Sequence, residues 1–357
     1  MARKIRPAPT GYDNRRPHVP NSQTPQLRLA KLKTFLHLAK VALGERAKAN
    51  IKNIGEKVYR GDMHMHTNYS DGGGTVADNK ETADLVGLDF IFVTDHKTIH
   101  QRKECRNLTR CWAGQEPVGP DHHLGLLGLR ETFVLGNNYI AEYRRALKLG
   151  IFPFVAHPCG WYPTRHYTKR QIDMVADIGD DLTIELINGA VQIIDAWDVT
   201  DARAVKLWDH LLSLGKTVRA IGNSDAHIPE AVGCAWNAVF TPRCTEKDVI
   251  AALWKGRNYL SEAPALSFRA YGIMMGDRIK PHGSSVRFNI AAADVDGLRE
   301  VRLVTRNGKV AKHWQLDDQI DFKATHTQRT TSRSLYFRLE VEAFDGKKAF
   351  SNPIYIV

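Results

Sequence analysis

The feature that most constrains the fold is a series of short apolar segments, each followed by polar residues and usually by a helical pattern. The expected strands are Val58–Met63, Asp89–Val93, Leu124–Leu129 or Phe133–Val134, Pro153–Ala156, Leu182–Leu186 and Val218–Ile221. The expected helices are Asp78–Val86, Asn138–Lys148, Lys169–Ala176, Asp201–Leu214 and Glu246–Trp254. This repeated β-then-α order predicts an α/β fold with a parallel sheet or barrel. Such folds carry their chemistry at the C-terminal ends of the strands.

Histidines and carboxylates follow four of the expected strands. The segments are Asp62-Met63-His64-Met65-His66 with Ser70-Asp71-Gly72 after it, Thr94-Asp95-His96, Ala156-His157-Pro158, and Asn223-Ser224-Asp225-Ala226-His227. Side chains two residues apart share a strand face, so each of the pairs His64/His66 and Asp225/His227 can face one centre. A single histidine at a strand end is more often structural, but these pairs together indicate a metal site. Imidazole with carboxylate suits Zn, Mn or Fe.

In this order the segments resemble the motifs of the PHP (polymerase and histidinol phosphatase) superfamily: H-x-H, S-D-G, T-D-H, H-P and S-D-A-H. The resemblance covers about residues 58–263. It implies a distorted (β/α)7 barrel that holds two or three divalent metal ions. The alternation of strands and helices is compatible with that fold.

The resemblance also implies a set of metal ligands. Gly114-Gln115-Glu116 is similar to the segment of a bridging glutamate, and counting back from Gly128 favours His123 over His122 as a further ligand. The first ion would take His64, His66, Glu116 and Asp225, the second Asp71, His96 and His227, and the third Glu116, His123 and His157. Glu116, Asp225 and His227 are also the expected catalytic residues.

Finer features resemble the CehA/McbA-type branch of the superfamily. They are Ile184-Glu185-Leu186-Ile187-Asn188-Gly189, a helix through Leu207-Trp208-Asp209, and Asp296-Gly297-Leu298. Glu185 and Asn188 are therefore expected to shape the substrate pocket. Lys97 stands where this branch often has Asn, and His122 stands where it usually has Gly. These departures bear on the choice of substrate.

The resemblance implies hydrolysis of a small-molecule ester by a metal-bound hydroxide. Phosphoesters are the favoured substrates, and carbamate or carboxylic esters are the alternative. Lys97, Arg165 and Arg219 are close in sequence to ligand segments and are candidates to bind phosphate oxygens, although each is individually more typical of a surface charge. A catalytically silent metal-binding module is a further alternative.

After Pro264 the sequence changes to short alternating segments with turn signals. The segments are Val286–Ala292, Val301–Thr305, Tyr336–Phe344 and Pro353–Val357, with Asn307-Gly308 and Asp345-Gly346 as the turns. Asn-Gly and Asp-Gly between strands are typical of hairpins. We therefore expect three regions: residues 1–57 as a basic arm and helix, 58–263 as the barrel, and 264–357 as an antiparallel β-sandwich.

The positive charge lies at the N-terminus. Residues 1–60 contain 14 Lys and Arg against three acids, and so account for the whole formal net charge of +11. Prolines predict a disordered arm over residues 1–23, and apolar residues at helical spacing predict an amphipathic basic helix over 26–55. That helix packs on the protein's own surface, or it contacts nucleic acid or an anionic membrane surface.

The five cysteines lack metal-binding spacing and cannot form a complete set of disulfides. A reducing compartment is therefore expected. The basic N-terminus is followed by a stretch that Lys33, His37 and Lys40 interrupt, so a signal peptide is not predicted. We expect a cytoplasmic protein.

Overall fold

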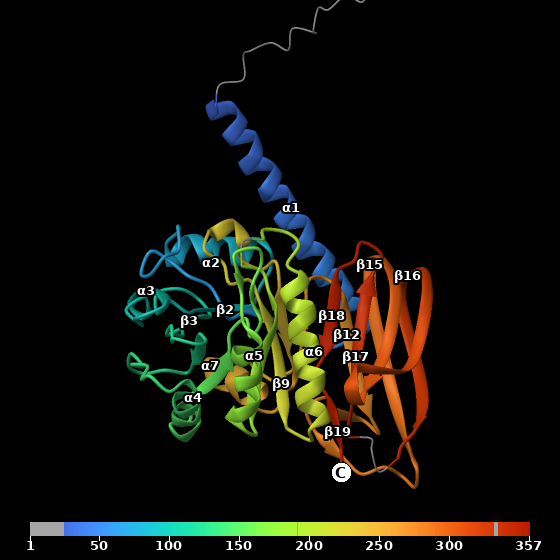
Figure 1. Ribbon diagram of the computed structural model, residues 1–357. Coiled ribbons are helices and arrows are strands. Elements are labelled where there is room, and N and C mark those ends of the chain that lie inside the picture. The colour runs from blue at the N-terminus through green and yellow to red at the C-terminus, as the bar shows by residue number, and fades with distance from the viewer. Residues whose placement is uncertain (1–24, 191, 332–334) are drawn as a thin grey trace, which may run out of the picture. The chain divides into compact units, whose positions relative to one another are not determined.

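A mixed α/β fold is seen in a computed structural model that describes residues 25–190, 192–331 and 335–357 (Figure 1). The chain divides into two units, Met1–Leu38 and Ala39–Val357. The predicted disordered arm, residues 1–23, lies outside the described residues. Within the described part, no helix is long and apolar enough to span a membrane.

Seven strands of the second unit carry the segments that contain the candidate ligands. Parallel pairing joins β1 to β2 and β2 to β3, and it also joins β5 to β8 and β8 to β9, whereas β4 is antiparallel to β5. Two isolated bridges, Gln115 to Leu126 and Met65 to Ala226, connect these two groups of strands. The bounds are β1 Tyr59–Asp62, β2 Phe90–Val93, β3 Cys111–Ala113, β4 Leu124–Leu127, β5 Phe152–Val155, β8 Leu182–Asn188 and β9 Val218–Asn223.

Side-chain caps begin most helices of this unit. Thr75, Asn138, Thr168, Asp198 and Thr245 each accept a hydrogen bond from a backbone N–H in the first turn, which satisfies a donor that the helix itself cannot. The helices are α2 Val76–Leu85, α3 Arg102–Cys105, α4 Tyr139–Lys148, α5 Lys169–Met174, α6 Val199–Ser213 and α7 Glu246–Trp254. The predicted helix over 246–254 has the observed bounds, and the others differ from the prediction by a few residues.

The C-terminal strands continue the sheet that contains β1. Strands β10 (Trp236–Val239) and β11 (Asn258–Ser261) extend it antiparallel from β1, and β11 pairs with β18 (Lys348–Ser351). The other strands after residue 264 are β12 Ala265–Ala270, β13 Ile273–Met274, β14 Arg278–Ile279, β15 Ser285–Thr305, β16 Lys309–Arg329, β17 Tyr336–Ala343 and β19 Ile354–Ile356. Backbone pairing thus crosses the boundary predicted at residue 264, and that boundary remains a prediction.

Helix α1 spans Pro25–Ile54, and its part from Ala39 onward is anchored by polar contacts. The Lys40 ammonium donates to the Val232 carbonyl at 2.9 Å, and Arg46 pairs with the buried Asp294 at 2.9 Å. Two of the basic side chains of the N-terminal region, Lys40 and Arg46, therefore form contacts within the second unit.

Candidate metal centre

The candidate ligands lie at one edge of the seven strands. His64 and His66 follow β1, His96 follows β2, Glu116 follows β3, His157 follows β5, and Asp225 and His227 follow β9. His123 precedes β4, but β4 is antiparallel to β5 and pairs Leu124 with Val155, so its first residue lies at the same edge. Strand direction therefore explains why residues 163 positions apart in the sequence converge.

Glu116 lies at the centre of the cluster. Its Oε1 atom is 3.2 Å from His64 Nε2, 3.1 Å from His123 Nδ1 and 3.0 Å from His157 Nε2. Its Oε2 atom is 3.4 Å from His66 Nε2 and 3.1 Å from His96 Nδ1. A fully buried carboxylate among five imidazoles is suited to bridge cations.

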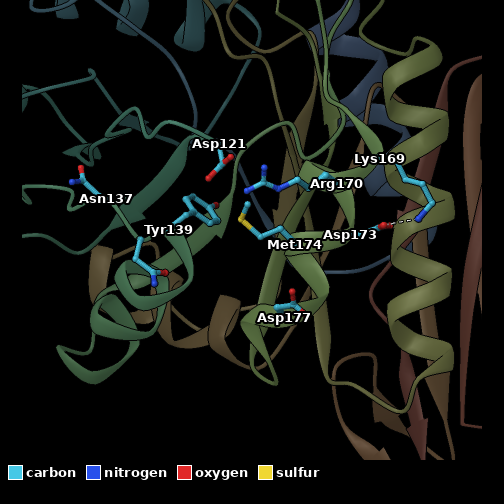
Figure 2. A pocket seen from close by; sticks show the side chains of 9 residues that line it. Asp121, Asn137, Tyr139, Lys169, Arg170, Asp173, Met174 and Asp177 are labelled. Carbon is cyan, nitrogen blue, oxygen red and sulfur yellow. Dashed lines mark hydrogen bonds and ion pairs between the residues drawn. The ribbon is translucent and has the colours of Figure 1, made fainter.

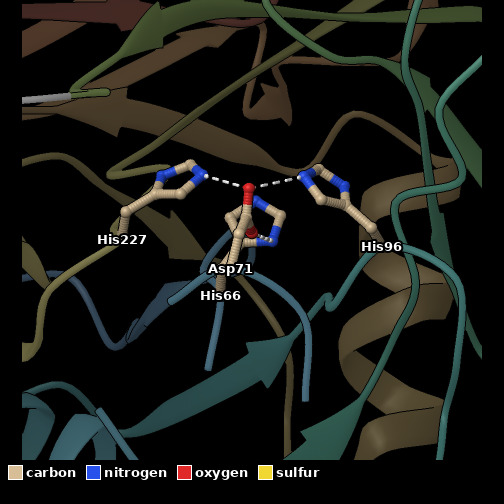
Figure 3. Close-up of side chains that lie close together, drawn as sticks. All are labelled: His66, Asp71, His96 and His227. Carbon is tan, nitrogen blue, oxygen red and sulfur yellow. Dashed lines mark ion pairs between the residues drawn. The ribbon is translucent and has the colours of Figure 1, made fainter. Parts of the chain in front are cut away.

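Several subsets of these residues have ligand atoms within 4.8 Å of one another. One contains His66, Asp71, His96 and His227, in which an Asp71 oxygen lies between the rings of His96 and His227 (Figure 3). The others are His64 with His157 and Asp225, His64 with His66 and Glu116, and His96 with Glu116 and His123. All nine candidate ligands thus lie in one cluster, although the subsets do not coincide with the three sets that the resemblance implies.

Hydrogen bonds to Nδ1 fix the ring orientation of three histidines. Nδ1 of His64 is 3.0 Å from Glu185 Oε1, Nδ1 of His96 is 3.0 Å from the Glu116 carbonyl, and Nδ1 of His227 is 2.9 Å from the Asp225 carbonyl. Each of these oxygens accepts a hydrogen bond, so Nδ1 is the donor and, in the neutral ring, Nε2 keeps its lone pair. Metal-binding histidines commonly have this arrangement.

Glu185 and Asn188 lie behind the candidate ligands. The Glu185 carboxylate accepts hydrogen bonds from His64, the His157 backbone N–H at 2.9 Å and the Asn188 amide at 2.8 Å. The same Asn188 amide is 3.2 Å from Asp225 Oδ2. Both side chains are buried and hold ligand residues in place.

Two buried aspartates that were not among the predicted site residues shape the loops of the cluster. Asp62 accepts from the backbone N–H groups of Ser224 and Gly233 at 3.1 and 3.0 Å, and burial raises its pKa to about 6. Asp95 accepts from the Thr67 hydroxyl and the Ser70 hydroxyl, both at 2.7 Å. Asp62 lies two residues before His64, and Asp95 lies directly before His96. These positions within the ligand motifs could have identified both aspartates from the sequence.

Gly72 is required by the tight turn that carries Asp71. A Cβ atom at Gly72 would lie 2.4 Å from the carbonyl of His66, closer than any non-bonded contact allows. The backbone of His157 and Asp225 also has positive φ angles of 30° and 49°. Strained backbone of this kind is typical of functional sites.

Charge within the cluster favours a cation. Burial alone would raise the pKa of Glu116, but positive charge on His64 and His123 holds it well below its ordinary value. Burial would lower the pKa of His66, yet its hydrogen bond to Asp225 and the nearby negative charge of Glu116 raise that pKa to about 9. The buried carboxylates are therefore negative and raise the pKa of His64, His66 and His96, whereas burial lowers that of His123. Bound divalent ions would supply positive charge to these carboxylates in place of protons.

His122 lies outside the cluster. Burial lowers its pKa to about 4, and its Nε2 lies 2.7 Å from the backbone carbonyl of Gln171, to which it donates. The neighbouring His123 points at Glu116 instead. The structure thus places His123, as counting from Gly128 suggested, beside the other candidate ligands.

A cavity of about 300 Å³ opens over the cluster. Of the residues that the structure describes, seven candidate ligands line it together with Trp161 and Ala190. The Asp71 and His227 side chains are 54% and 40% exposed, whereas His64, His66 and Glu116 are at most 1% exposed. Solvent and substrate therefore reach the cluster from the side of Asp71 and His227.

A larger hollow of about 730 Å³ lies between α4 and α5 (Figure 2). Its polar lining contains both signs of charge, and Lys169 is paired there with Asp173. None of the nine candidate ligands lines it. The smaller cavity is therefore the candidate site.

The three predicted phosphate-binding cations are placed differently. Lys97 follows His96 and is exposed, and Arg165 is exposed on a short hairpin with Trp161. Arg219 lies at the start of β9, where its guanidinium contacts Asp181 at 3.3 Å and the ring of Trp254. Arg219 therefore lies near one end of β9, whereas Asp225 follows the other end of that strand, beyond Asn223.

The donor atoms fit divalent ions. His64 Nε2, His66 Nδ1, Glu116 Oε2 and His157 Nδ1 are buried without a hydrogen-bond partner among the described residues. His64 Nε2 lies 3.2 Å from both Glu116 and Asp225, but without hydrogen-bond geometry to either. Buried polar atoms without partners are rare, and a cation beside His64 Nε2 and Glu116 Oε2 would satisfy these two.

Comparison with known proteins gives one sequence match. The PHP-associated family matches residues 216–258, a segment that contains Asp225 and His227. No curated protein matches the chain.

Among solved structures, the chain is similar to a two-domain protein from Bacteroides vulgatus that contains a predicted PHP-like metal-dependent phosphoesterase. The identity is 17%, the TM-score is 0.48, and the match covers 85% of this chain and 95% of that one. A lesion-specific endonuclease from Pyrococcus furiosus matches at 18% identity and a TM-score of 0.40, over 56% of each chain. A putative metal-dependent phosphoesterase from Bifidobacterium adolescentis matches at 14% identity and a TM-score of 0.36, over 47% and 87%.

Proposed function

We propose that this chain is a metal-dependent hydrolase of the PHP superfamily that cleaves phosphoesters of small molecules. The observation that carries the proposal is the position of Glu116, whose two oxygens lie within 3.4 Å of nitrogens of five histidines. A structural carboxylate needs far fewer partners. A bridge between divalent ions needs this arrangement.

The proposal assigns the ions to the ligand sets given by the resemblance. His64, His66, Glu116 and Asp225 would hold one ion, Asp71, His96 and His227 a second, and Glu116, His123 and His157 a third. Zn, Mn or Fe suits this mixture of imidazole and carboxylate. Strand pairing and the two isolated bridges join the seven strands into a closed ring, which supports a distorted (β/α)7 barrel. We also propose that the chain belongs to the CehA/McbA-type branch.

Hydrolysis breaks the bond between phosphorus and the ester oxygen. The oxygen of a water molecule bonds to phosphorus, the ester oxygen leaves, and a proton from that water ends on the leaving oxygen. Bound divalent ions supply Lewis acidity, which favours ionisation of water and offsets the negative charge of the phosphoryl group.

The protein's own residues orient the reacting groups. Glu185 holds His64 in one tautomer, and Asp95 holds the loop that presents Asp71. The inner ligands are shielded from bulk water, while Asp71 and His227 remain accessible at the cavity mouth. A phosphate group entering there would meet the outer ligands first.

The experiment is to load the full chain with Zn, Mn or Fe and to compare turnover of a phosphomonoester, a phosphodiester and an aryl carbamate. The proposal expects chelator-sensitive cleavage of a phosphoester. Cleavage of the carbamate alone would move the assignment to carbamate esters. A metal-loaded protein that is inert on every substrate class would favour the binding-module alternative.

A further inference from the structure

The cavity over the metal cluster has one large apolar surface. Among the described residues, which exclude position 191, Trp161 and Ala190 line it beside the candidate ligands, and Ala190 offers little contact area. Trp161 is partly exposed. The indole of Trp161 is therefore a surface against which a group attached to the phosphate of a substrate can pack.

The Trp161 side chain is held at a fixed angle by its neighbours. Its ring centroid lies 4.7 Å from that of His157, 5.4 Å from that of His123 and 6.2 Å from that of the buried Tyr167. Trp161 also pairs with Arg165 across the hairpin of β6 (Gly160–Trp161) and β7 (Arg165–His166). The indole is thus set beside the ligands before any substrate arrives.

We propose that Trp161 selects esters whose leaving group is a planar aromatic ring, such as an aryl phosphate, by stacking against that ring. This inference rests on the proposed function. A cavity of about 300 Å³ accommodates a phosphate with one or two rings, at the lower end of ligand-site sizes. In the reaction the phenolic oxygen leaves phosphorus and takes up a proton of the attacking water.

A purely structural role for Trp161 would have another consequence. If the indole only supported His123 and His157, its removal would impair all substrates equally, because both histidines are candidate ligands. If the indole binds the leaving group, its removal affects aromatic substrates selectively. The ratio between an aryl and an alkyl substrate separates these roles.

The test compares phenyl phosphate with methyl phosphate in the metal-loaded full chain and in Trp161→Ala and Trp161→Phe. Loss of an aromatic contact typically changes an equilibrium about 2- to 12-fold. We expect Trp161→Ala to lower kcat/KM for phenyl phosphate by about that factor relative to methyl phosphate, and Trp161→Phe to restore most of it. Tyr162→Ala is the matched control, because Tyr162 is on the same hairpin and 44% exposed but does not line the cavity.

Binding of phenylphosphonate and methylphosphonate, measured by calorimetry, gives a readout that does not depend on turnover. Weaker binding of phenylphosphonate alone in Trp161→Ala supports the inference, even if neither phosphate is hydrolysed and the proposed function fails. Equal loss for both ligands, or no aryl preference in the wild type, overturns the inference. Turnover of methyl phosphate in that case would leave the proposed function standing.

Discussion

Glu185 Oε1 lies 3.0 Å from His64 Nδ1, and both side chains are fully shielded from solvent. The same carboxylate also accepts hydrogen bonds from the Asn223 and Asn188 amides at 2.7 and 2.8 Å and from the His157 backbone. One buried carboxylate on β8 thereby connects the loops that follow β1, β5 and β9. We infer that it positions ligands from three strands.

The first prediction concerns Glu185→Gln. The substituted amide presents one oxygen and one NH2 group to four donors, so two of them lose their acceptor: either His64 and Asn223, or Asn188 and the His157 backbone. We expect metal affinity to fall about 10- to 100-fold, as is typical for such supporting residues. Competition with a chromophoric chelator measures this directly. Glu81→Gln, on an exposed face of α2, is the control, and an equal affinity in both variants would contradict the positioning role.

The second prediction concerns two ligands. His64→Ala and Asp225→Asn each remove a donor atom without removing an apolar core side chain. We expect each to lower hydrolysis by more than about 100-fold, beyond the effect of a supporting residue. Circular dichroism should show an unchanged fold. Wild-type rates in either pure variant would refute the site assignment.

The third prediction concerns the contact between α6 and the C-terminal strands. Arg338 is completely buried and donates to both oxygens of Asp209, at 3.0 and 2.8 Å. Glu340 also pairs with Arg338, so Asp209→Asn removes one of the two acidic partners of the buried guanidinium. Loss of a buried hydrogen bond between charged groups typically costs about 1.5–3 kcal/mol. Asp209→Asn should lower the free energy of unfolding in urea by about that amount. Asp173→Asn, which breaks the exposed pair with Lys169, should leave it within error.

The fourth prediction concerns the basic N-terminus. Removing residues 1–38 takes away the first unit and leaves the Lys40, Arg46 and Asn50 contacts, whereas removing residues 1–57 breaks all three. If the first unit contacts nucleic acid or an anionic membrane, the shorter deletion should abolish salt-sensitive binding and leave turnover of small esters unchanged.

Binding to duplex DNA and to phosphatidylserine vesicles at about 50 and 200 mM salt distinguishes the two partners. Equal binding by the full and the shortened chain would exclude this role for the first unit. The longer deletion should be less stable to heat than the shorter one, because Arg46 no longer pairs with the buried Asp294.

The strands that carry the site were predictable because burial on both faces leaves continuous apolar segments. The segments Phe90–Val93 and Leu124–Leu127 are examples. Strand β3, Cys111–Ala113, was missed because three residues give no pattern. Strand β16 was missed because it is a largely exposed edge strand that pairs with β15. Its apolar face, with Trp314, Leu316, Ile320 and Phe322, is interrupted by Lys312 and Asp318. The sequence predicted its partner β15 as two separate segments, Val286–Ala292 and Val301–Thr305, because the pairing of β15 is irregular near Leu298.

The composition of the cluster was predictable, but the roles around it were not. Motif spacing placed His64 and His66 on one face, and strand direction brought Glu116 to them. The contribution of Glu185 depends on which atoms surround its carboxylate, and the short sequence segment contains no such information. Trp161 reaches the cavity only through the β6–β7 hairpin, whose two-residue strands carry no periodicity.

The most direct test of the central claim is the divalent metal content of the purified chain after reconstitution with Zn, Mn or Fe, measured by mass spectrometry beside Glu116→Gln. Because Glu116 contacts five histidines, we predict more than one ion per wild-type chain and a clear loss of bound metal in the variant. A wild-type chain that binds no metal, or a variant that binds as much as the wild type, would contradict the account.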